Sequence, residues 1–137
     1  MVVRVGALDP GGAIGAAILY DGTDPLRYEV REFRDEVEAW QWIRSNADEV
    51  VIEDFTGSGF RDHWAVYTLK QVGAFTMAAK LAGVTYTVVQ PGARKRFIEW
   101  AIAELNLRPS DPVHRADALA HARSYSERRR QSATKAT

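Results

Sequence analysis

The sequence predicts an α/β fold, in which helices flank a central five-stranded mixed sheet. Three segments near the N-terminus have strand character and are separated by short turns, which indicates an antiparallel unit. Two further short apolar segments alternate with helical patterns, as parallel strands do when helices connect them. With 137 residues, the chain can build one hydrophobic core and is too short for two ordinary domains.

Three predicted strands open the chain. Residues 2–8 are rich in β-branched side chains, and residues 13–20 form a second apolar run after the turn residues Gly11 and Gly12. In residues 26–33, apolar and polar side chains alternate. We expect these three strands to lie antiparallel in one sheet.

The middle of the chain changes period. Residues 35–47 have apolar side chains three or four apart after an acidic start, which predicts a helix. Residues 49–54 form a short apolar strand that ends in two carboxylates, and residues 55–63 form a loop. A long helix is expected over residues 64–81, with Gly83 as its C-cap.

The C-terminal third predicts one more strand and two helices. The strand covers residues 84–89, and the helices cover residues 93–105 and 112–125. The last segment, residues 126–137, is polar and basic without apolar periodicity, so we expect a frayed, disordered tail. The interpretation is a single domain over residues 1–125 followed by this tail.

The composition restricts the possible functions. The hydrophobic fraction is 46%, and no apolar run approaches the roughly 20 residues of a membrane span, so a membrane partner is not expected. Because there is no cysteine, any metal has to rest on carboxylates and imidazole, which favours Mg²⁺ or Mn²⁺. The N-terminus has no secretory signal pattern, and an intracellular, cytoplasmic location is expected.

Charge is unevenly distributed although the formal net charge is zero. Residues 1–90 contain 8 basic and 13 acidic side chains, whereas residues 91–137 contain 10 basic and 5 acidic ones. This asymmetry leaves room for a basic face beside an acidic pocket, as a nucleic-acid partner requires.

Acidic and imidazole side chains occur where separate elements can meet. Asp9 ends the first predicted strand and Glu53 ends the fourth, with Asp54 as a weaker candidate beside it. His114 and Asp117 are three residues apart on the last helix and therefore share a face. Clustered carboxylates suffer desolvation and mutual repulsion unless a divalent cation compensates them. The pattern therefore favours a bound divalent cation, and two such ions can activate a water and stabilise the leaving 3′ oxygen of a phosphodiester.

Five segments resemble, in order, motifs of RuvC-type Holliday junction resolvases. They are residues 8–17 (LDPGGAIGAA), 51–53 (VIE), 69–74 (LKQVGA), 90–95 (QPGARK) and 114–120 (HRADALA). In the closing motif, His114 stands where some members have Asp. The Gly-rich stretch that usually follows the fourth motif is replaced by residues 97–100 (FIEW). The chain, with 137 residues, is shorter than the cellular resolvases of this family, and such compactness suits a phage-encoded member.

The resemblance implies an RNase H-like fold and a symmetric homodimer that nicks two opposed strands of a four-way DNA junction. The products would carry 5′-phosphates, and the activity would belong to DNA recombination and repair. Asp9, Glu53 and Asp117 would bind Mg²⁺, or Mn²⁺ in its place, and His114 would be a ligand or position the water. Residues 64–81, Phe75 included, have an apolar excess and are the expected dimer surface.

DNA contacts are expected from basic side chains on both sides of the site. A basic run starts the helix over residues 93–105, where backbone N–H groups can also hold phosphate. An aromatic residue after Glu53 can wedge against unstacked bases, as one does in the family. The candidates are Arg94, Lys95, Arg96, Lys70, Arg61 and Phe60.

Three other functions remain open from the sequence. A related RNase H-like nuclease could use the same metal site on flap DNA, other branched DNA or structured RNA. The Asp-x-Gly opening also occurs in sugar kinases and actin-like ATPases, but these need two domains. A catalytically dead DNA scaffold is disfavoured, because buried clustered acids destabilise a protein that binds no metal.

Overall fold

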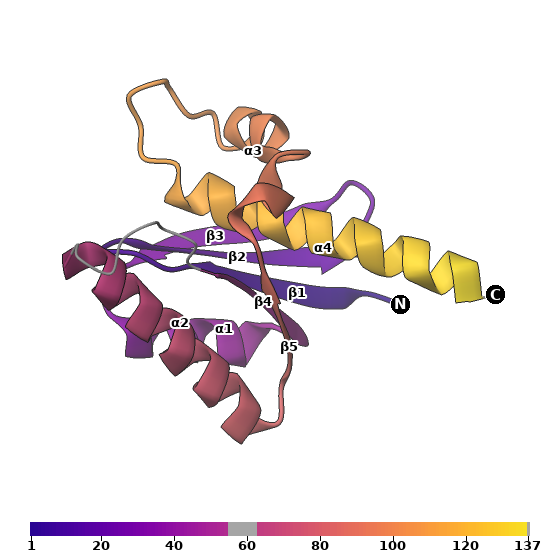
Figure 1. Ribbon diagram of the computed structural model, residues 1–137. Helices are drawn as coiled ribbons and strands as arrows, with labels where there is room; N and C mark the ends of the chain where they lie inside the picture. The colour runs from indigo at the N-terminus through magenta and orange to yellow at the C-terminus, as the bar shows by residue number, and fades with distance from the viewer. Residues whose placement is uncertain (55–62, 137) are drawn as a thin grey trace.

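The computed structural model describes residues 1–54 and 63–136, and it has three layers. A five-stranded sheet lies between two layers of helices (Figure 1). The helices are α1 (Glu36–Asn46) and α2 (His63–Ala82) on one face, and α3 (Ile98–Glu104) and α4 (His114–Ala136) on the other. Both faces of the sheet are therefore covered, and the predicted α/β architecture is confirmed.

The strands are β1 (Val3–Asp9), β2 (Ile14–Asp21), β3 (Arg27–Phe33), β4 (Glu49–Glu53) and β5 (Thr85–Val89). Their order in the sheet is β3-β2-β1-β4-β5. The pairs β1–β2 and β2–β3 are antiparallel, whereas β1–β4 and β4–β5 are parallel. The predicted mixed sheet, with three antiparallel strands and then two parallel ones, is confirmed.

The central strands are apolar on both faces because both faces are buried. In β1, Val5 and Ala7 belong to the core under α3 and α4, whereas Leu8 belongs to the core over α1 and α2. In β4, Val51 faces the first core while its two neighbours face the second. Continuous burial of this kind explains why β4 has an unbroken apolar run before its terminal carboxylate.

Helices α1 and α2 begin and end within one residue of the predicted bounds. The carboxylate of Asp35 caps α1 and accepts hydrogen bonds from the backbone N–H groups of Val37 (2.7 Å) and Glu38 (3.1 Å). Helix α2 is followed by Gly83, whose φ of 69° lies in the left-handed region that glycine adopts most readily.

The predicted helix over residues 93–105 is wrong in its first half. The chain instead forms a 3₁₀ helix, η1 (Pro91–Arg94), and a further turn before α3 begins. Backbone N–H groups of Lys95 and Phe97 donate to carbonyls three residues earlier, which tightens the chain. This turn brings Phe97, which is 8% exposed, into the core. Tertiary burial of one aromatic side chain thus outweighs the local helical pattern.

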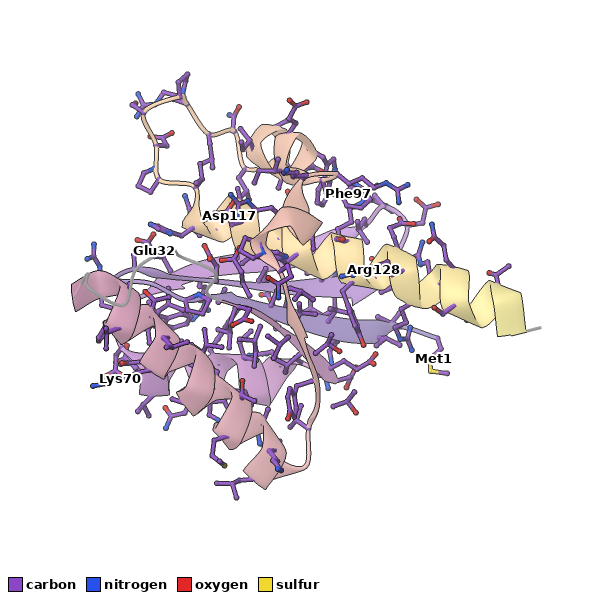
Figure 2. The ribbon with its side chains drawn as sticks, in the orientation of Figure 1. Met1, Glu32, Lys70, Phe97, Asp117 and Arg128 are labelled. Carbon is purple, nitrogen blue, oxygen red and sulfur yellow. The ribbon has the colours of Figure 1, made fainter. Side chains whose placement is uncertain are left out.

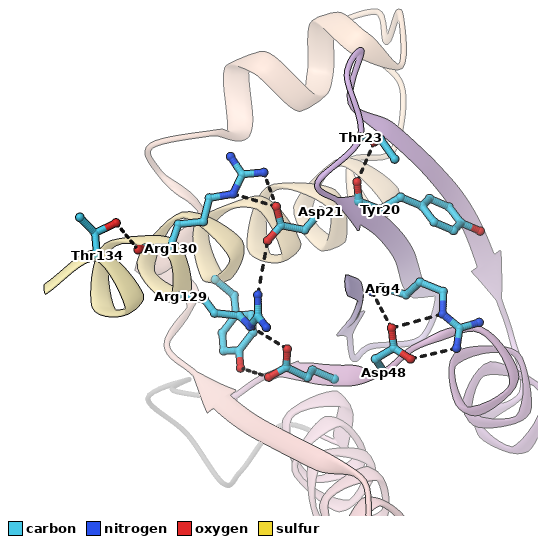
Figure 3. A network of polar contacts seen from close by, with 10 residues as sticks. Arg4, Tyr20, Asp21, Thr23, Asp48, Arg129, Arg130 and Thr134 are labelled. Carbon is cyan, nitrogen blue, oxygen red and sulfur yellow. Dashed lines mark hydrogen bonds and ion pairs between the residues drawn. The ribbon is translucent and has the colours of Figure 1, made fainter. Parts of the chain in front are cut away.

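The predicted disordered tail over residues 126–137 is also wrong, because α4 extends into this segment. Arg130 donates to the carboxylate of Asp21 on β2, with 2.8 Å between Nε and Oδ1 (Figure 3). Arg129 Nε lies 2.9 Å from Glu49 Oε2 on β4. Ion pairs with distant strand residues stabilise the end of the helix, and apolar periodicity could not indicate them. The interpretation of residues 1–125 as a single nuclease domain stays a prediction.

No helix in the described part of the chain is long and apolar enough to cross a membrane.

Candidate active site

Three carboxylates from three elements meet at one end of the sheet. Asp9 is the last residue of β1 and Glu53 is the last residue of β4. These strands are parallel neighbours in the register Leu8↔Ile52, so the two acids follow adjacent positions at the same edge. Asp117 comes from the start of α4, which lies over this end of the sheet (Figure 2). The fold therefore joins residues that are 108 positions apart in the sequence.

Asp9 is the most buried of the three acids, with a side chain 7% exposed. Burial raises the pKa of Asp9 to about 8, and the neighbouring carboxylates of Glu53 and Asp117 act in the same direction. His114 opposes this shift, with its Nδ1 3.7 Å from Asp9 Oδ2. The acid at this position therefore retains a proton at neutral pH in the free protein.

Glu53 has the opposite shift. Burial by itself raises the pKa of Glu53, but the hydrogen bond with His121, the proximity of Asp9 and the charge of Arg94 together lower it to about 2. His121 Nε2 lies 2.9 Å from Glu53 Oε1, and His121 is 1% exposed. The pair of Asp9 and Glu53 thus carries one proton and one negative charge, which limits repulsion inside the fold.

Asp117 completes the cluster and is held by Arg94. The side chain of Asp117 is 11% exposed, and Arg94 Nε lies 3.1 Å from its Oδ1. Burial raises the pKa of Asp117, and the charge of Arg94 lowers it in part. The same guanidinium donates from Nη1 to Glu53 Oε1 at 3.1 Å. Arg94 therefore bridges two acids from two different elements.

Two contacts position the segments around the acidic cluster: a close approach of two backbones and a hydrogen bond from the backbone to a side chain. An added Cβ at Gly15 would overlap the backbone carbonyl of His114, so the absence of a side chain lets α4 approach β2. The buried side chain of Gln71 on α2 accepts a hydrogen bond from the backbone N–H of Gly11 at 2.8 Å. These contacts orient the first turn of α4 and the loop that follows Asp9.

His114 is the most accessible of the four predicted site residues, with a side chain 38% exposed. The carboxylate of Asp9 raises the pKa of His114, and partial burial opposes this effect. All four predicted residues, Asp9, Glu53, His114 and Asp117, therefore lie in one place, although their catalytic roles stay predictions. Asp54 directly follows the cluster, and its backbone N–H donates to the carbonyl of Val89 at 2.7 Å.

The residues predicted for the site do not include His121, and Arg94 is expected from the sequence only as a DNA contact. The spacing of four residues between Asp117 and His121 places both on one face of α4, and this signal was available in the sequence. The position of Arg94 had no such signal, because it depends on the tight turn of η1.

Unlike the four predicted site residues, the side chains predicted to contact DNA do not all lie in one place. Lys95 and Arg96 are exposed beside the site, and the Arg96 guanidinium carbon lies 5.0 Å from the centre of the Phe97 ring. The expectation that this basic run starts a helix is wrong, because α3 begins only after it. Lys70 is exposed on α2, on the other face of the sheet from α4 (Figure 2). Arg61 and Phe60 lie outside the described residues.

Comparison with known proteins gives a clear structural result. No protein-family model matches the chain, and no curated protein matches its sequence significantly. A structure of T. thermophilus RuvC in complex with a Holliday junction substrate matches with a TM-score of 0.71 at 19% identity, over 94% of this chain and 96% of that chain. A second Thermus thermophilus RuvC structure matches with a TM-score of 0.68 at 21% identity, over 96% of this chain and 97% of that chain.

This chain has the RuvC fold. The predicted RNase H-like, RuvC-type architecture is therefore confirmed, and the match extends over nearly the whole of both chains.

The donors of the acidic cluster have the chemistry that a hard divalent cation prefers. Three carboxylates, each no more than 12% exposed, lie together, and such crowding is costly unless positive charge compensates it. Arg94 supplies part of that charge through its two ion pairs. Within residues 1–54 and 63–136, no group of three or more His, Cys, Asp or Glu side chains has an arrangement that could hold a metal ion in the present conformation. A cation would therefore bind only after these side chains rearrange.

Proposed function

We propose that this chain is a structure-selective endonuclease that resolves four-way DNA junctions by metal-dependent hydrolysis of phosphodiester bonds. One observation carries the proposal: Asp9, Glu53 and Asp117 meet at one end of the sheet in a chain that has the RuvC fold. A RuvC of this fold has been seen with a Holliday junction substrate. An intracellular location, in the compartment that holds such DNA, stays a prediction.

We assign Asp9, Glu53 and Asp117 as ligands of Mg²⁺, with Mn²⁺ able to replace it and two ions in each site. Bound ions of this kind lower the pKa of a water molecule and stabilise the leaving 3′ oxygen of a phosphodiester. Carboxylate oxygens are the ligands that these cations prefer, which agrees with the absence of cysteine from the sequence.

The residues of the chain have separable roles in this proposal. Asp9 has to release the proton that its raised pKa retains before it can act as a full ligand. His121 orients the carboxylate of Glu53 from the buried side. His114 is partly exposed and can contact a substrate phosphate or the attacking water from the open side. Its position depends on the close approach of α4 to Gly15.

The DNA-binding surface is proposed to surround the acidic cluster. Residues 91–137 hold the basic excess of the chain and supply η1, α3 and α4, which cover one face of the sheet. Lys95 and Arg96 project from this half next to the site and are the first candidates for phosphate contacts. Such contacts would position the backbone without reading the sequence.

Paired cleavage of opposed strands requires two sites, and we propose a symmetric homodimer that leaves 5′-phosphate ends. Helix α2 buries Phe75 and Ala79 in the core. Its opposite side leaves Met77 55% exposed and Leu81 81% exposed. Exposed apolar side chains of this size favour a second copy of the chain at this face.

The test is a cleavage assay with a labelled four-way junction, a matched duplex, a flap and a structured RNA, in Mg²⁺ or EDTA. We expect paired nicks in the junction alone, only with Mg²⁺. The substitutions Asp9→Asn, Glu53→Gln and Asp117→Asn should each lower the rate by about a hundredfold or more while junction binding persists. Glu104→Gln, which makes the same chemical change on the exposed surface of α3, should cleave like the wild type.

The substrate that is cut separates the alternatives. Metal-dependent cleavage of flap or RNA but not of the junction would keep the acidic site and replace the proposed substrate. Binding without cleavage of any substrate would reduce the protein to a DNA-binding module.

A further inference from the structure

Arg94 lies inside the acidic cluster and not on the open surface. Its Nη1 is 3.1 Å from Glu53 Oε1, and its Nε is 3.1 Å from Asp117 Oδ1. Both acids are largely buried, with side chains 12% and 11% exposed, whereas the Arg94 side chain is 36% exposed. One guanidinium thus reaches from the rim of the site to two carboxylates in it.

The neighbours of Arg94 provide a contrast within one basic run. Lys95 and Arg96 are exposed, and neither has an ion pair with a residue in the described part of the chain. The 3₁₀ turn of η1 ends at Arg94 and turns this side chain alone toward the cluster. Three consecutive cations of the sequence therefore have two different environments.

We infer that Arg94 is an internal counterion that competes with divalent cations for Glu53 and Asp117. The inference rests on the proposed function, because it concerns the same acidic site. The guanidinium N–H groups occupy oxygen lone pairs that a metal ion would use, and two positive centres at one carboxylate repel each other. Metal binding therefore displaces the Arg94 guanidinium from the acids.

Displacement has a consequence for DNA binding. The guanidinium is partly exposed and its flexible stem allows it to move outward, toward the face where Lys95 and Arg96 lie. There it can donate to a backbone phosphate, which it cannot do while both acids hold it. Metal and DNA then favour each other's binding, because each removes Arg94 from the competition for the other.

The test measures Mn²⁺ binding by calorimetry with the full chain, stripped with EDTA and free of DNA, so that it does not depend on cleavage. Arg94→Gln should bind Mn²⁺ with a Kd lower by about tenfold or more. Arg96→Gln is the matched control, because it removes the same charge two residues further along the chain from a side chain that has no ion pair with the acids, and it should change the Kd by less than about twofold. Without metal, Arg94→Gln should unfold at a lower temperature than the wild type and gain more from added Mn²⁺.

If Arg94→Gln is too unstable to study, Arg94→Lys provides the test, because it keeps the charge but loses the planar fork that reaches two acids. Its affinity for Mn²⁺ should again exceed that of the wild type. Equal affinities in the wild type and both Arg94 variants would overturn the inference while leaving the proposed metal site intact. An equal gain in Arg96→Gln would also overturn it, because net charge would then explain the effect. Failure of every variant to bind Mn²⁺ would overturn both this inference and the metal site.

Discussion

Asp9 is the residue at which folding and function conflict most directly. Its carboxyl group is buried beside two other acids, and its pKa is raised to about 8. An unfolded chain has no such crowding, and the ordinary value there is 3.8. The folded state of the free protein therefore binds a proton that the unfolded state releases.

The expected result is a stability that falls as pH rises. Because the folded pKa of Asp9 is above the unfolded one, its contribution is fully present below about pH 4 and is lost progressively up to about pH 8. Asp9 by itself should lower the free energy of unfolding in EDTA by at most about 1.4 kcal/mol per pH unit in this window. The raised pKa of His114 acts in the same direction.

Asp9→Asn removes this titration, and its free energy of unfolding should depend less on pH. Urea unfolding of both proteins at pH 5, 6.5 and 8, in EDTA, measures the difference. Parallel curves for the two proteins would contradict a raised pKa at Asp9.

Gly15 lies where β2 has no room for a side chain beside α4. Gly15→Ala would place a methyl group on the backbone carbonyl of His114, and rigid backbone cannot yield easily. We expect a loss of about 1–3 kcal/mol in the free energy of unfolding. Gly73→Ala is the control, because its Cβ meets no atom within 4 Å and lies in the interior of a helix, where alanine stabilises by about 0.5–1 kcal/mol. Equal effects of the two substitutions would show that the approach of α4 to β2 is not tight.

The site was predictable at the residues that the local pattern marks. Asp9 and Glu53 each follow an apolar strand, and Asp117 shares a helix face with His114, so the sequence places them at element ends and on one side. The second role of Arg94 was not predictable, because a run of three cations does not indicate which one turns inward. That choice depends on the backbone of η1 and on the burial of Phe97.

At the scale of the element, α4 provides the clearest difference between pattern and structure. Its C-terminal turns have no apolar stripe, yet Arg129 and Arg130 pair with Asp21 and Glu49 on two strands (Figure 3). Asp21 is only 4% exposed, so its charge needs these partners. The long helix is therefore stabilised by charge compensation for buried acids.

Arg130→Gln tests this account of the helix end. Among the described residues, the substitution leaves Asp21 its longer ion pair with Arg129, at 3.8 Å, and it should lower the free energy of unfolding by about 1–2 kcal/mol. Arg128→Gln, an exposed neighbour with the same change of charge, should shift it by less than about 0.5 kcal/mol. Denaturant unfolding of the two variants decides the question, and identical midpoints would mean that the ion pair adds no stability.

At the scale of the whole molecule, α2 presents the surface expected for a second copy. Phe75, which the sequence suggested for this surface, is 1% exposed and belongs to the core, so a charge there would disrupt folding and not test association. Among the described side chains of α2, Met77 and Leu81 are the two most exposed large apolar ones.

The double substitution Met77→Lys and Leu81→Lys should convert a dimer to a monomer in sedimentation velocity at unchanged helix content. Junction cleavage should then become unpaired nicking, because each strand needs its own site. Val2→Lys, at an exposed apolar residue away from α2, is the control. A wild type that sediments as a monomer at micromolar concentration would refute this dimer surface.

The sequence by itself determined the fold class, the order of the strands along the chain, the three acids of the cluster and His114 beside them. These features are local: strand and helix periods, turn residues and the ends of apolar runs are all visible in short windows. Tertiary structure alone decided where the chain departs from its local pattern. Helix α3 begins later than its local pattern predicts because Phe97 is buried in the core. Arg94 lies in the site because η1 turns it inward. Helix α4 continues beyond its apolar pattern because its arginines pair with Asp21 and Glu49. Burial and charge compensation act between residues far apart in the chain, and no short window of sequence contains both partners.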